Sequence, residues 1–251
     1  MSGEYDVFSL FYDELIGDDE QNARADYVIS LLKQYAKDGG ILLDLACGTG
    51  KITRKAKEAG YDCIGVDISP EMLNIARENS EDNEILYLCQ DMRNLDLFGT
   101  IDACICTLDS LNHLIEDEDF VAAVEKVALF MNPGGIFIFD VNTEYKHRNI
   151  LANNTFVFET DNVFCVWQND TDEKLITEIN LDFFKNDGND NYIRYFENFF
   201  ERAYSEEFIK NTLNNAGFEI VHIFEELTQN PVKEDTERAF FVCRRKEWQL
   251  Q

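Results

Sequence analysis

The stretch ILLDLACGTGKIT, residues 41–53, decides the fold. Its opening residues, ILLDLA, form a short apolar run, as expected of a strand that is buried on both faces of a parallel sheet. A tight turn with glycines at positions 48 and 50 follows, and the residues after it are typical of a helix. Such a turn lets the backbone approach a charged small molecule closely. The stretch therefore predicts a ligand-binding α/β domain.

Strands and helices alternate on both sides of this stretch. An amphipathic helix is predicted over residues 22–37. Further helices are predicted over residues 51–59, 70–79 and 117–131, and strands over residues 61–69, 85–92, 101–108 and 135–142. This rhythm predicts a doubly wound, mostly parallel, Rossmann-like sheet with helices on both faces.

The pattern changes after residue 146. Residues 155–204 are rich in aromatic residues in near alternation with polar ones, which predicts antiparallel strands and hairpins, with DGND (187–190) as a turn. From residue 205 a helix and two strands return to the α/β pattern. We therefore expect a helical lid segment at 1–40, an α/β domain made of 41–146 and 205–251, and an antiparallel β cap at 147–204, inserted before the last helix. Ligands bind at the carboxyl edge of an open α/β sheet, and the cap is expected above that edge.

Composition excludes several classes of protein. The chain has 251 residues with 49 acidic against 22 basic side chains, a net charge of −27, which disfavours nucleic acid and anionic membranes as partners. Seven cysteines without a CxxC pair indicate reduced thiols, hence a cytoplasmic protein, and no metal site is predicted. The N-terminal residues show no signal-peptide pattern, and no apolar run is long enough for a membrane helix.

Two phosphate-binding motifs fail at defined positions of the glycine turn. A dinucleotide fingerprint needs a third glycine where this chain has Thr53, and a P-loop needs a glycine where it has Leu45 and Ser or Thr where it has Ile52. What remains is the pattern D-x-A-x-G-x-G, which starts at Asp44.

Three carboxylates end the first three predicted strands. Asp44 suits a cationic group such as an amino acid ammonium. Asp67 can accept hydrogen bonds from two vicinal ribose hydroxyls, and Asp91 can meet an adenine amine. A ligand with ribose, adenine and an amino acid but no phosphate is S-adenosylmethionine.

With these residues the chain resembles the class I S-adenosylmethionine-dependent methyltransferases, and among them a small bacterial subgroup whose substrates are largely unassigned. The matching stretches are LLDLACGTG (42–50), GVDISPEML (65–73), QDMRNLDL (90–97), CTLDSLNHL (106–114) and MNPGGIFIFDVNTEYK (131–146), together with FYDEL (11–15) and ERAYS (201–205). The resemblance covers essentially the whole chain and implies seven strands in the sheet, the last of them antiparallel.

The resemblance also implies which residues hold S-adenosylmethionine. They are Tyr12, which closes over the cofactor, then Asp44, Ala46, Cys47, Gly48 and Gly50 at its methionine end, Asp67 at the ribose, and Ile68, Asp91 and Met92 at the adenine. Many members have glycine where this chain has Ala46.

The expected activity is methyl transfer from S-adenosylmethionine to a nitrogen or oxygen nucleophile of a small molecule. The cofactor supplies the reactivity, so the protein mainly aligns the reactants and excludes water. Candidates for a catalytic role follow the fourth and fifth strands: Asp109, His113 and Tyr145. Candidates for substrate binding are Asn112, His147, Trp167 and Arg202. Each has a purely structural alternative, such as capping, loop hydrogen bonding, packing within the cap, or pairing with neighbouring glutamates.

Three other functions stay open at this point. The chain could bind the cofactor without transferring its methyl group, or it could methylate RNA or protein. TLDS (107–110) stands where a base-methylating enzyme would carry an NPPY-like tetrad, which argues against a nucleic-acid base as acceptor. A dehydrogenase rests on fold analogy alone. The accepting atom and the oligomeric state do not follow from the sequence.

Overall fold

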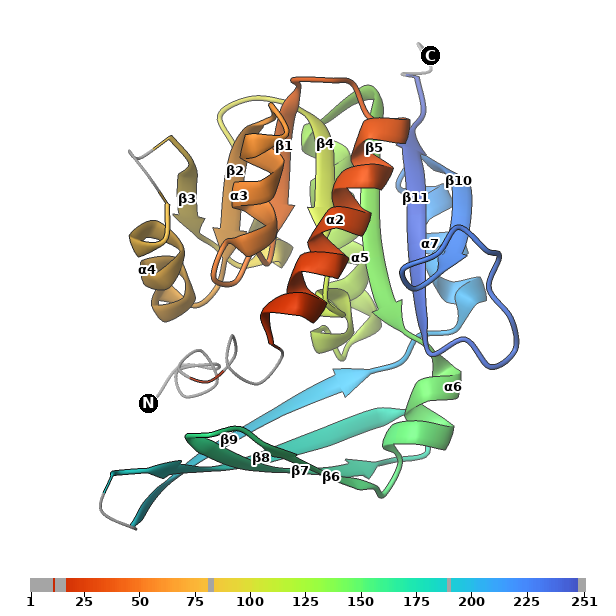
Figure 1. The fold of residues 1–251 in the computed structure, drawn as a ribbon. Coiled ribbons are helices and arrows are strands. Elements are labelled where there is room, and N and C mark those ends of the chain that lie inside the picture. The colour runs from red at the N-terminus through yellow and green to blue at the C-terminus, as the bar shows by residue number, and fades with distance from the viewer. Residues whose placement is uncertain (1–10, 12–16, 81–83, 189–190, 248–251) are drawn as a thin grey trace.

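Two β-sheets organise the chain in the computed structural model, which describes residues 11, 17–80, 84–188 and 191–247 (Figure 1). The larger sheet has seven strands in the order β10-β11-β5-β4-β1-β2-β3, and the smaller has four in the order β6-β7-β8-β9. The larger sheet is parallel except for β11, which runs antiparallel to both of its neighbours. The predicted fold class is confirmed, including the antiparallel last strand and the antiparallel insert before the last helix.

The elements have the following bounds. Strands of the larger sheet are β1 (Ile41–Leu45), β2 (Asp62–Asp67), β3 (Leu86–Cys89), β4 (Ile101–Cys106), β5 (Met131–Asn142), β10 (Phe218–Glu225) and β11 (Arg238–Arg245). Strands of the smaller sheet are β6 (Thr155–Glu159), β7 (Val163–Thr171), β8 (Ile176–Asn186) and β9 (Tyr192–Arg202). Helices are α2 (Asp18–Tyr35), α3 (Lys51–Glu58), α4 (Pro70–Glu78), α5 (Asp117–Phe130), α6 (Glu144–Lys146) and α7 (Glu206–Asn215). Short 3₁₀ turns occupy Met92–Asn94 and Ser110–His113, and a π-helical turn occupies His147–Leu151.

Strand β1 lies between β4 and β2 in the interior of the larger sheet and carries apolar side chains toward both faces. Leu42 belongs to the core beneath α2 and α3, whereas Leu43 and Leu45 belong to the core beneath α5 and α7. All three side chains are fully buried. Figure 1 shows α2 and α3 in front of the sheet, with α5 and α7 behind it. The continuous apolar run of the sequence thus corresponds to a strand covered by helices on both faces.

Two elements begin earlier than the sequence pattern predicts. Helix α2 starts at Asp18 rather than at residue 22, because the acidic residues of its first turn favour the positive end of the helix dipole. Strand β5 starts at Met131, directly after α5, rather than at residue 135. Its first residues pair with β4 through a register shift between Ile101 and Ala103, which accommodates Pro133 and its missing N–H.

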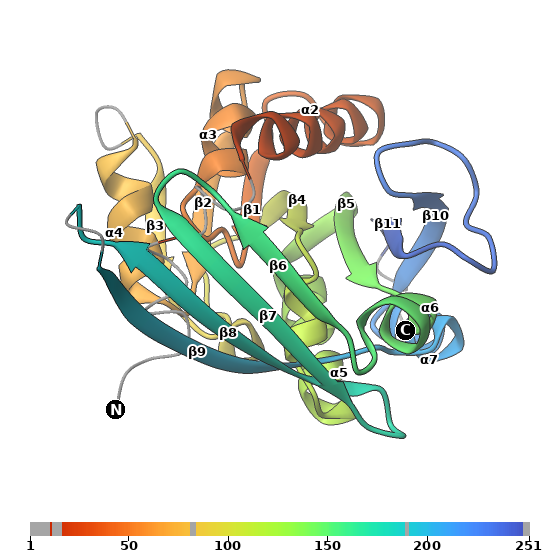
Figure 2. The same ribbon diagram turned by 60° about the horizontal axis from the view of Figure 1, so that its bottom comes forward.

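The smaller sheet lies across the carboxyl ends of β1, β4 and β5 (Figures 1 and 2). Its inner side chains form a separate apolar cluster that includes Cys165, Leu181, Phe183 and Phe199. Phe11, from the start of the chain, is buried in the same cluster and stacks on Phe183 with ring centroids 4.8 Å apart. Within the described ranges, no helix combines the length and apolar character that crossing a membrane requires.

Candidate active site

A cavity of about 720 Å³ lies between the carboxyl edge of the larger sheet and the smaller sheet. Asp44, Asp67 and Asp91, the three acids at strand ends, all lie in its wall. Its volume is in the usual range for small-molecule sites, roughly 300–1,000 Å³. The carboxyl edge that the sequence predicts as the ligand edge is therefore hollow.

Asp44 and Thr53 are joined across the glycine turn. The Thr53 hydroxyl, in the first turn of α3, donates a hydrogen bond of 2.5 Å to Oδ2 of Asp44. Burial raises the pKa of Asp44 to about 7, although the bond from Thr53 opposes the shift. Thr53, which stands where a dinucleotide motif has its third glycine, thus holds the Asp44 carboxylate in place. The second oxygen of Asp44 is left for a cationic ligand group.

The backbone of the turn takes left-handed conformations that bring it close to the cavity. The φ angles are 60° at Ala46, 52° at Gly48 and 74° at Gly50. A Cβ at Gly50 would lie 2.5 Å from the Tyr87 hydroxyl, so only glycine fits there. A Cβ at Gly48 would meet no atom within 4 Å. Ala46 accepts a conformation that glycine adopts without strain, which accounts for the glycine that the resemblance associates with this position.

Asp67, at the end of β2, fixes the same turn. Its carboxylate accepts from the backbone N–H of Gly48 at 2.8 Å and from that of Ser69 at 2.9 Å. Burial raises the pKa of Asp67, and these backbone bonds oppose the shift. Each oxygen retains a lone pair, so two ribose hydroxyls still have acceptors. Next to it, Ile68 is 48% exposed and lies in the cavity wall, where it offers an apolar surface.

Asp91 and Met92 line the cavity at the end of β3. Asp91 is paired with Arg93, whose Nε lies 2.9 Å from Oδ2, and this hydrogen bond lowers the pKa of Asp91. Arg93 also donates to Asp119 at 2.8 Å. Asp91 is thus a charged carboxylate that Arg93 holds in place at the cavity wall.

The turn after β4 is strained and clamped. Leu108 and Asp109 both have positive φ angles, 59° and 51°, which cost energy in residues other than glycine. The Asp140 carboxylate, on neighbouring β5, accepts from both of their backbone N–H groups, at 2.7 and 3.0 Å. Asp140 is fully buried. These two hydrogen bonds, called the Asp140 clamp below, fix the turn, and the side chain of Asp109 lies in the cavity wall.

Arg238 stabilises this clamp from β11. The antiparallel register places Arg238 opposite Asn142, at the end of β5. Its guanidinium pairs with Asp140 and lies 3.2 Å from the Asp109 carboxylate. Burial alone would raise the pKa of Asp109, but Arg238 and Lys146 outweigh it and hold that pKa well below its usual range. Asp109 is therefore a permanent negative charge on the cavity wall.

A second carboxylate, Glu201 of strand β9, lies in the same wall. Oε2 of Glu201 accepts from the Asn142 side chain at 3.0 Å. Nε2 of His113 lies 4.0 Å from Oε1, and Nε2 of His147 lies 3.9 Å from Oε2. Burial, followed by the charge of Asp109, raises the pKa of Glu201 to about 8. Unlike Asp109, Glu201 can gain or lose a proton near neutral pH.

The structure brings Asp109, His113 and Trp167 together in the cavity wall. Trp167 donates from Nε1 to Asn169 at 2.6 Å and packs between Phe156 and Phe158. The cap therefore supplies both aromatic side chains and the Glu201 carboxylate to the cavity wall. Tyr12 lies outside the described residues, so its predicted role over the cofactor stays a prediction.

Three other candidates do not line the cavity. Asn112 is fully buried, and its side-chain amide joins the backbone of Asn142 to that of Arg202. Tyr145 and His147 also lie outside the lining residues. His147 is fully buried, with Nδ1 at 2.8 Å from the Thr177 hydroxyl, so it can act on the cavity only through Glu201. Asn112 thus joins the two sheets, and its predicted contact with the substrate stays a prediction.

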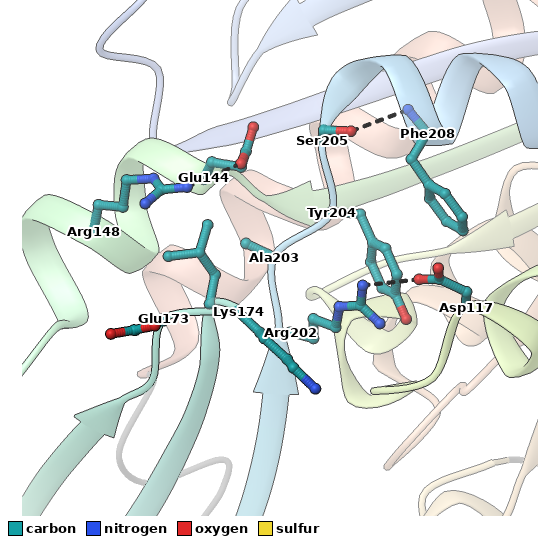
Figure 3. A pocket seen from close by; sticks show the side chains of 11 residues that line it. Asp117, Glu144, Arg148, Glu173, Lys174, Arg202, Ala203, Tyr204, Ser205 and Phe208 are labelled. Atoms are coloured by element: carbon teal, nitrogen blue, oxygen red, sulfur yellow. Dashed lines mark hydrogen bonds and ion pairs between the residues drawn. The ribbon is translucent and has the colours of Figure 1, made fainter.

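Arg202 does not line the large cavity either. It borders a separate depression of about 270 Å³, shown in Figure 3, where its guanidinium pairs with Asp117 at 2.8 Å. It also donates to the Ile115 carbonyl at 2.8 Å and stacks over Tyr204. These contacts fasten β9 to the start of α5. Its predicted role in substrate binding stays a prediction.

Sequence reasoning missed five residues of the site: Asp140, Asn142, Lys146, Glu201 and Arg238. Asp140 and Asn142 could have been found, since they end a predicted strand as the three recognised acids do. Arg238 could not, because only the antiparallel register of β11 brings it to Asp140, 98 residues away in the chain.

Comparisons with known proteins agree with this geometry. A methyltransferase-domain family matches residues 42–135. YqeM of Bacillus subtilis (strain 168), which is named as a methyltransferase, is 31% identical over 244 residues, 96% of this chain and 97% of that protein. The chain belongs to the class I S-adenosylmethionine-dependent methyltransferases. The crystal structure of an S-adenosylmethionine-dependent methyltransferase from Clostridium acetobutylicum ATCC 824 superposes with a TM-score of 0.86 at 31% identity, covering 97% of this chain and 99% of that one.

A third relative matches only part of the chain. The glycine/sarcosine N-methyltransferase of Parasynechococcus marenigrum (strain WH8102) is 35% identical over 150 residues, which are 57% of this chain and 49% of that protein. The two full-length matches show that the chain is an enzyme of the methyltransferase family that uses S-adenosylmethionine. The open space beside Gly48 and the exposed face of Ile68 are consistent with such a ligand.

Proposed function

We propose that the enzyme transfers the methyl group of S-adenosylmethionine to an amine nitrogen of a small molecule. One observation carries the proposal: a single cavity joins the glycine turn at Asp44–Gly48 to a wall that presents the carboxylates of Asp109 and Glu201. A protonated amine is the acceptor group that such a wall favours, because Asp109 is charged throughout and Glu201 adds a second negative charge above its pKa of about 8. The glycine/sarcosine N-methyltransferase that resembles residues of this chain is named for amine acceptors, which supports the same choice.

The proposal gives each predicted cofactor residue a task. Asp44 would bind the ammonium of the methionine moiety, Asp67 the ribose hydroxyls, and Ile68 with Met92 the two sides of the adenine. When bound, the cofactor supplies an electrophilic methyl group on a sulfonium. The chain's own residues orient the acceptor and exclude water, and the aromatic inner face of the cap segment 147–204 serves the second task.

The composition supports a small acceptor in the cytoplasm. A net charge of −27 opposes binding to RNA. All seven cysteines are free thiols, as suits a reducing compartment.

Methylation of small amines is the direct test. The full chain is incubated with methyl-labelled S-adenosylmethionine and matched acceptors: glycine against glycolate, sarcosine, a polyamine and an amino sugar, with RNA and denatured cell protein as separate arms. We expect label on at least one amine and none on glycolate. Label on RNA or protein alone would contradict the proposal, and so would tight binding of S-adenosylhomocysteine with no transfer to any amine.

Binding of S-adenosylhomocysteine should depend on pH through Asp44. Its pKa of about 7 in the ligand-free protein means that ionised Asp44, the form that pairs with an ammonium, predominates above pH 7 and is lost as the pH falls. Affinity should therefore fall about tenfold between pH 8 and pH 6, as expected for one competing proton. Isothermal titration at several pH values measures the fall. Asp44→Asn should bind more weakly and with a flat profile, whereas a fall that persists in that variant would assign it to another group.

A further inference from the structure

We propose that Glu201 accepts the proton that the acceptor nitrogen releases, and that buried His147 behind it passes the proton on. The inference rests on the proposed amine acceptor. Glu201 belongs to the cap strand β9, yet its carboxylate reaches the wall that the strand ends of the larger sheet form. No other glutamate among the described cap residues lines that cavity.

The carboxylate of Glu201 is held by groups from several elements. Asn142 of β5 donates to it, and His113, from the turn after β4, faces its other oxygen. The charges around it are those of Asp109, Lys146 and Arg238. Asp109 disfavours a second negative charge, while Lys146 and Arg238 favour it. Glu201 is therefore buried but balanced between its two protonation states, as a general base requires.

His147 offers a route for the proton away from the cavity. Its Nε2 is fully buried, faces Oε2 of Glu201 at 3.9 Å, and has no hydrogen-bond partner among the described residues. Burial lowers the pKa of His147 to about 4, so the ring is neutral at pH 7 and the contact is no ion pair. A buried ring nitrogen without a partner calls for an explanation, and a proton arriving from Glu201 supplies one.

The route continues through two hydroxyls. Nδ1 of His147 lies 2.8 Å from Oγ1 of Thr177, which lies 2.9 Å from Oγ1 of half-buried Thr171. Each of these groups can accept one proton and give up another. The chain Glu201–His147–Thr177–Thr171 thus leads from the cavity to the rim of the cap.

The acceptor ammonium first gives one proton to the Glu201 carboxylate, which becomes a neutral carboxyl group. The freed electron pair of the nitrogen then forms the bond to the methyl carbon, while the electron pair of the carbon–sulfur bond stays on sulfur and leaves a neutral thioether. Glu201 returns to its charged form by giving its proton to Nε2 of His147 as Nδ1 passes a proton to Thr177, so the buried ring, whose pKa is about 4, does not hold both protons.

The first test needs no acceptor. Infrared spectra of the full chain are recorded from pH 6 to pH 10, and the C=O stretch of a protonated carboxyl group is followed. We expect a band that disappears as the pH rises through about 8, that is absent in Glu201→Gln, and that persists in Glu197→Gln, a buried glutamate four residues away on the same strand. His147→Asn, which keeps a polar atom near Thr177 but removes Nε2, should shift the midpoint. A band unchanged in Glu201→Gln would overturn the assignment.

The second test measures methyl transfer to the best amine of the acceptor panel. Loss of a general base typically lowers the rate by about 100-fold or more. We therefore expect Glu201→Gln to lower kcat by about that factor and to abolish its rise with pH, with the affinity for S-adenosylhomocysteine unchanged. Equal pH profiles in wild type and Glu201→Gln would overturn the proposal. If no amine is methylated while the infrared band behaves as expected, the amine assignment fails and the protonation site at Glu201 stands.

Discussion

Replacing Arg238 with methionine is expected to lower the free energy of unfolding by about 3–5 kcal/mol. The guanidinium is nearly buried and is the cationic partner of Asp140, which is fully buried, and of Asp109. Removing it leaves two carboxylates close together in a poorly solvated place. Asp140 would then lack the cation that balances its charge. The turn after β4, which Asp140 holds, already contains two residues at positive φ.

Urea denaturation of the full chain measures this loss. The matched control is Arg148→Met, because Arg148 is 56% exposed and forms an ion pair with Glu144, one helical turn away. An exposed pair of this kind contributes about 0.5 kcal/mol or less. The double variant Arg238→Met/Asp140→Asn should recover part of the lost stability, since it removes one uncompensated charge. A loss below about 1 kcal/mol in Arg238→Met would mean that the Asp140 clamp does not depend on its cation.

Asp67→Ala is expected to weaken binding of S-adenosylhomocysteine about 100-fold, or on the order of 3 kcal/mol. Two effects add up. The ribose loses a charged acceptor, and the glycine turn loses the anchor that the carboxylate gives to the N–H of Gly48. The turn must then be ordered by the ligand itself, at the expense of affinity.

Isothermal titration measures the change, with Asp62→Ala as the control. Asp62 is an exposed aspartate at the start of the same strand, so its loss should leave affinity unchanged within a factor of two or so. Thermal unfolding of both variants shows whether the fold persists. If Asp67→Ala binds as tightly as wild type, the ribose lies elsewhere and Asp67 only shapes the turn.

The cofactor half of the site could be predicted, because its residues directly follow strands that are recognisable in the sequence. Asp44, the small residues after it and Asp67 all follow short apolar runs, and the carboxyl ends of neighbouring parallel strands must share one edge. The failure of the dinucleotide motif also indicated this site. Thr53 stands where that motif has its third glycine, and its hydroxyl donates a hydrogen bond to Asp44.

The acceptor half could not be predicted, because packing between distant segments creates it. Glu201 stands among alternating aromatic and polar residues and looks like any outward-facing glutamate of a cap strand. Only the position of the cap over the sheet turns it toward Asn142. The same packing carries Arg202, a scarce positive charge that suggests substrate binding, to Asp117 on the outside.

In a crystal structure of the full chain with S-adenosylhomocysteine, we expect one cavity to hold the cofactor at three strand ends and to leave room for the acceptor between Asp109 and Glu201. The ribose hydroxyls should lie on the Asp67 carboxylate and the adenine between Ile68 and Met92. The sulfur should face the side of the cavity that carries Asp109 and Glu201. A ligand whose sulfur faces away from those two carboxylates, or whose ribose does not touch Asp67, would contradict this arrangement.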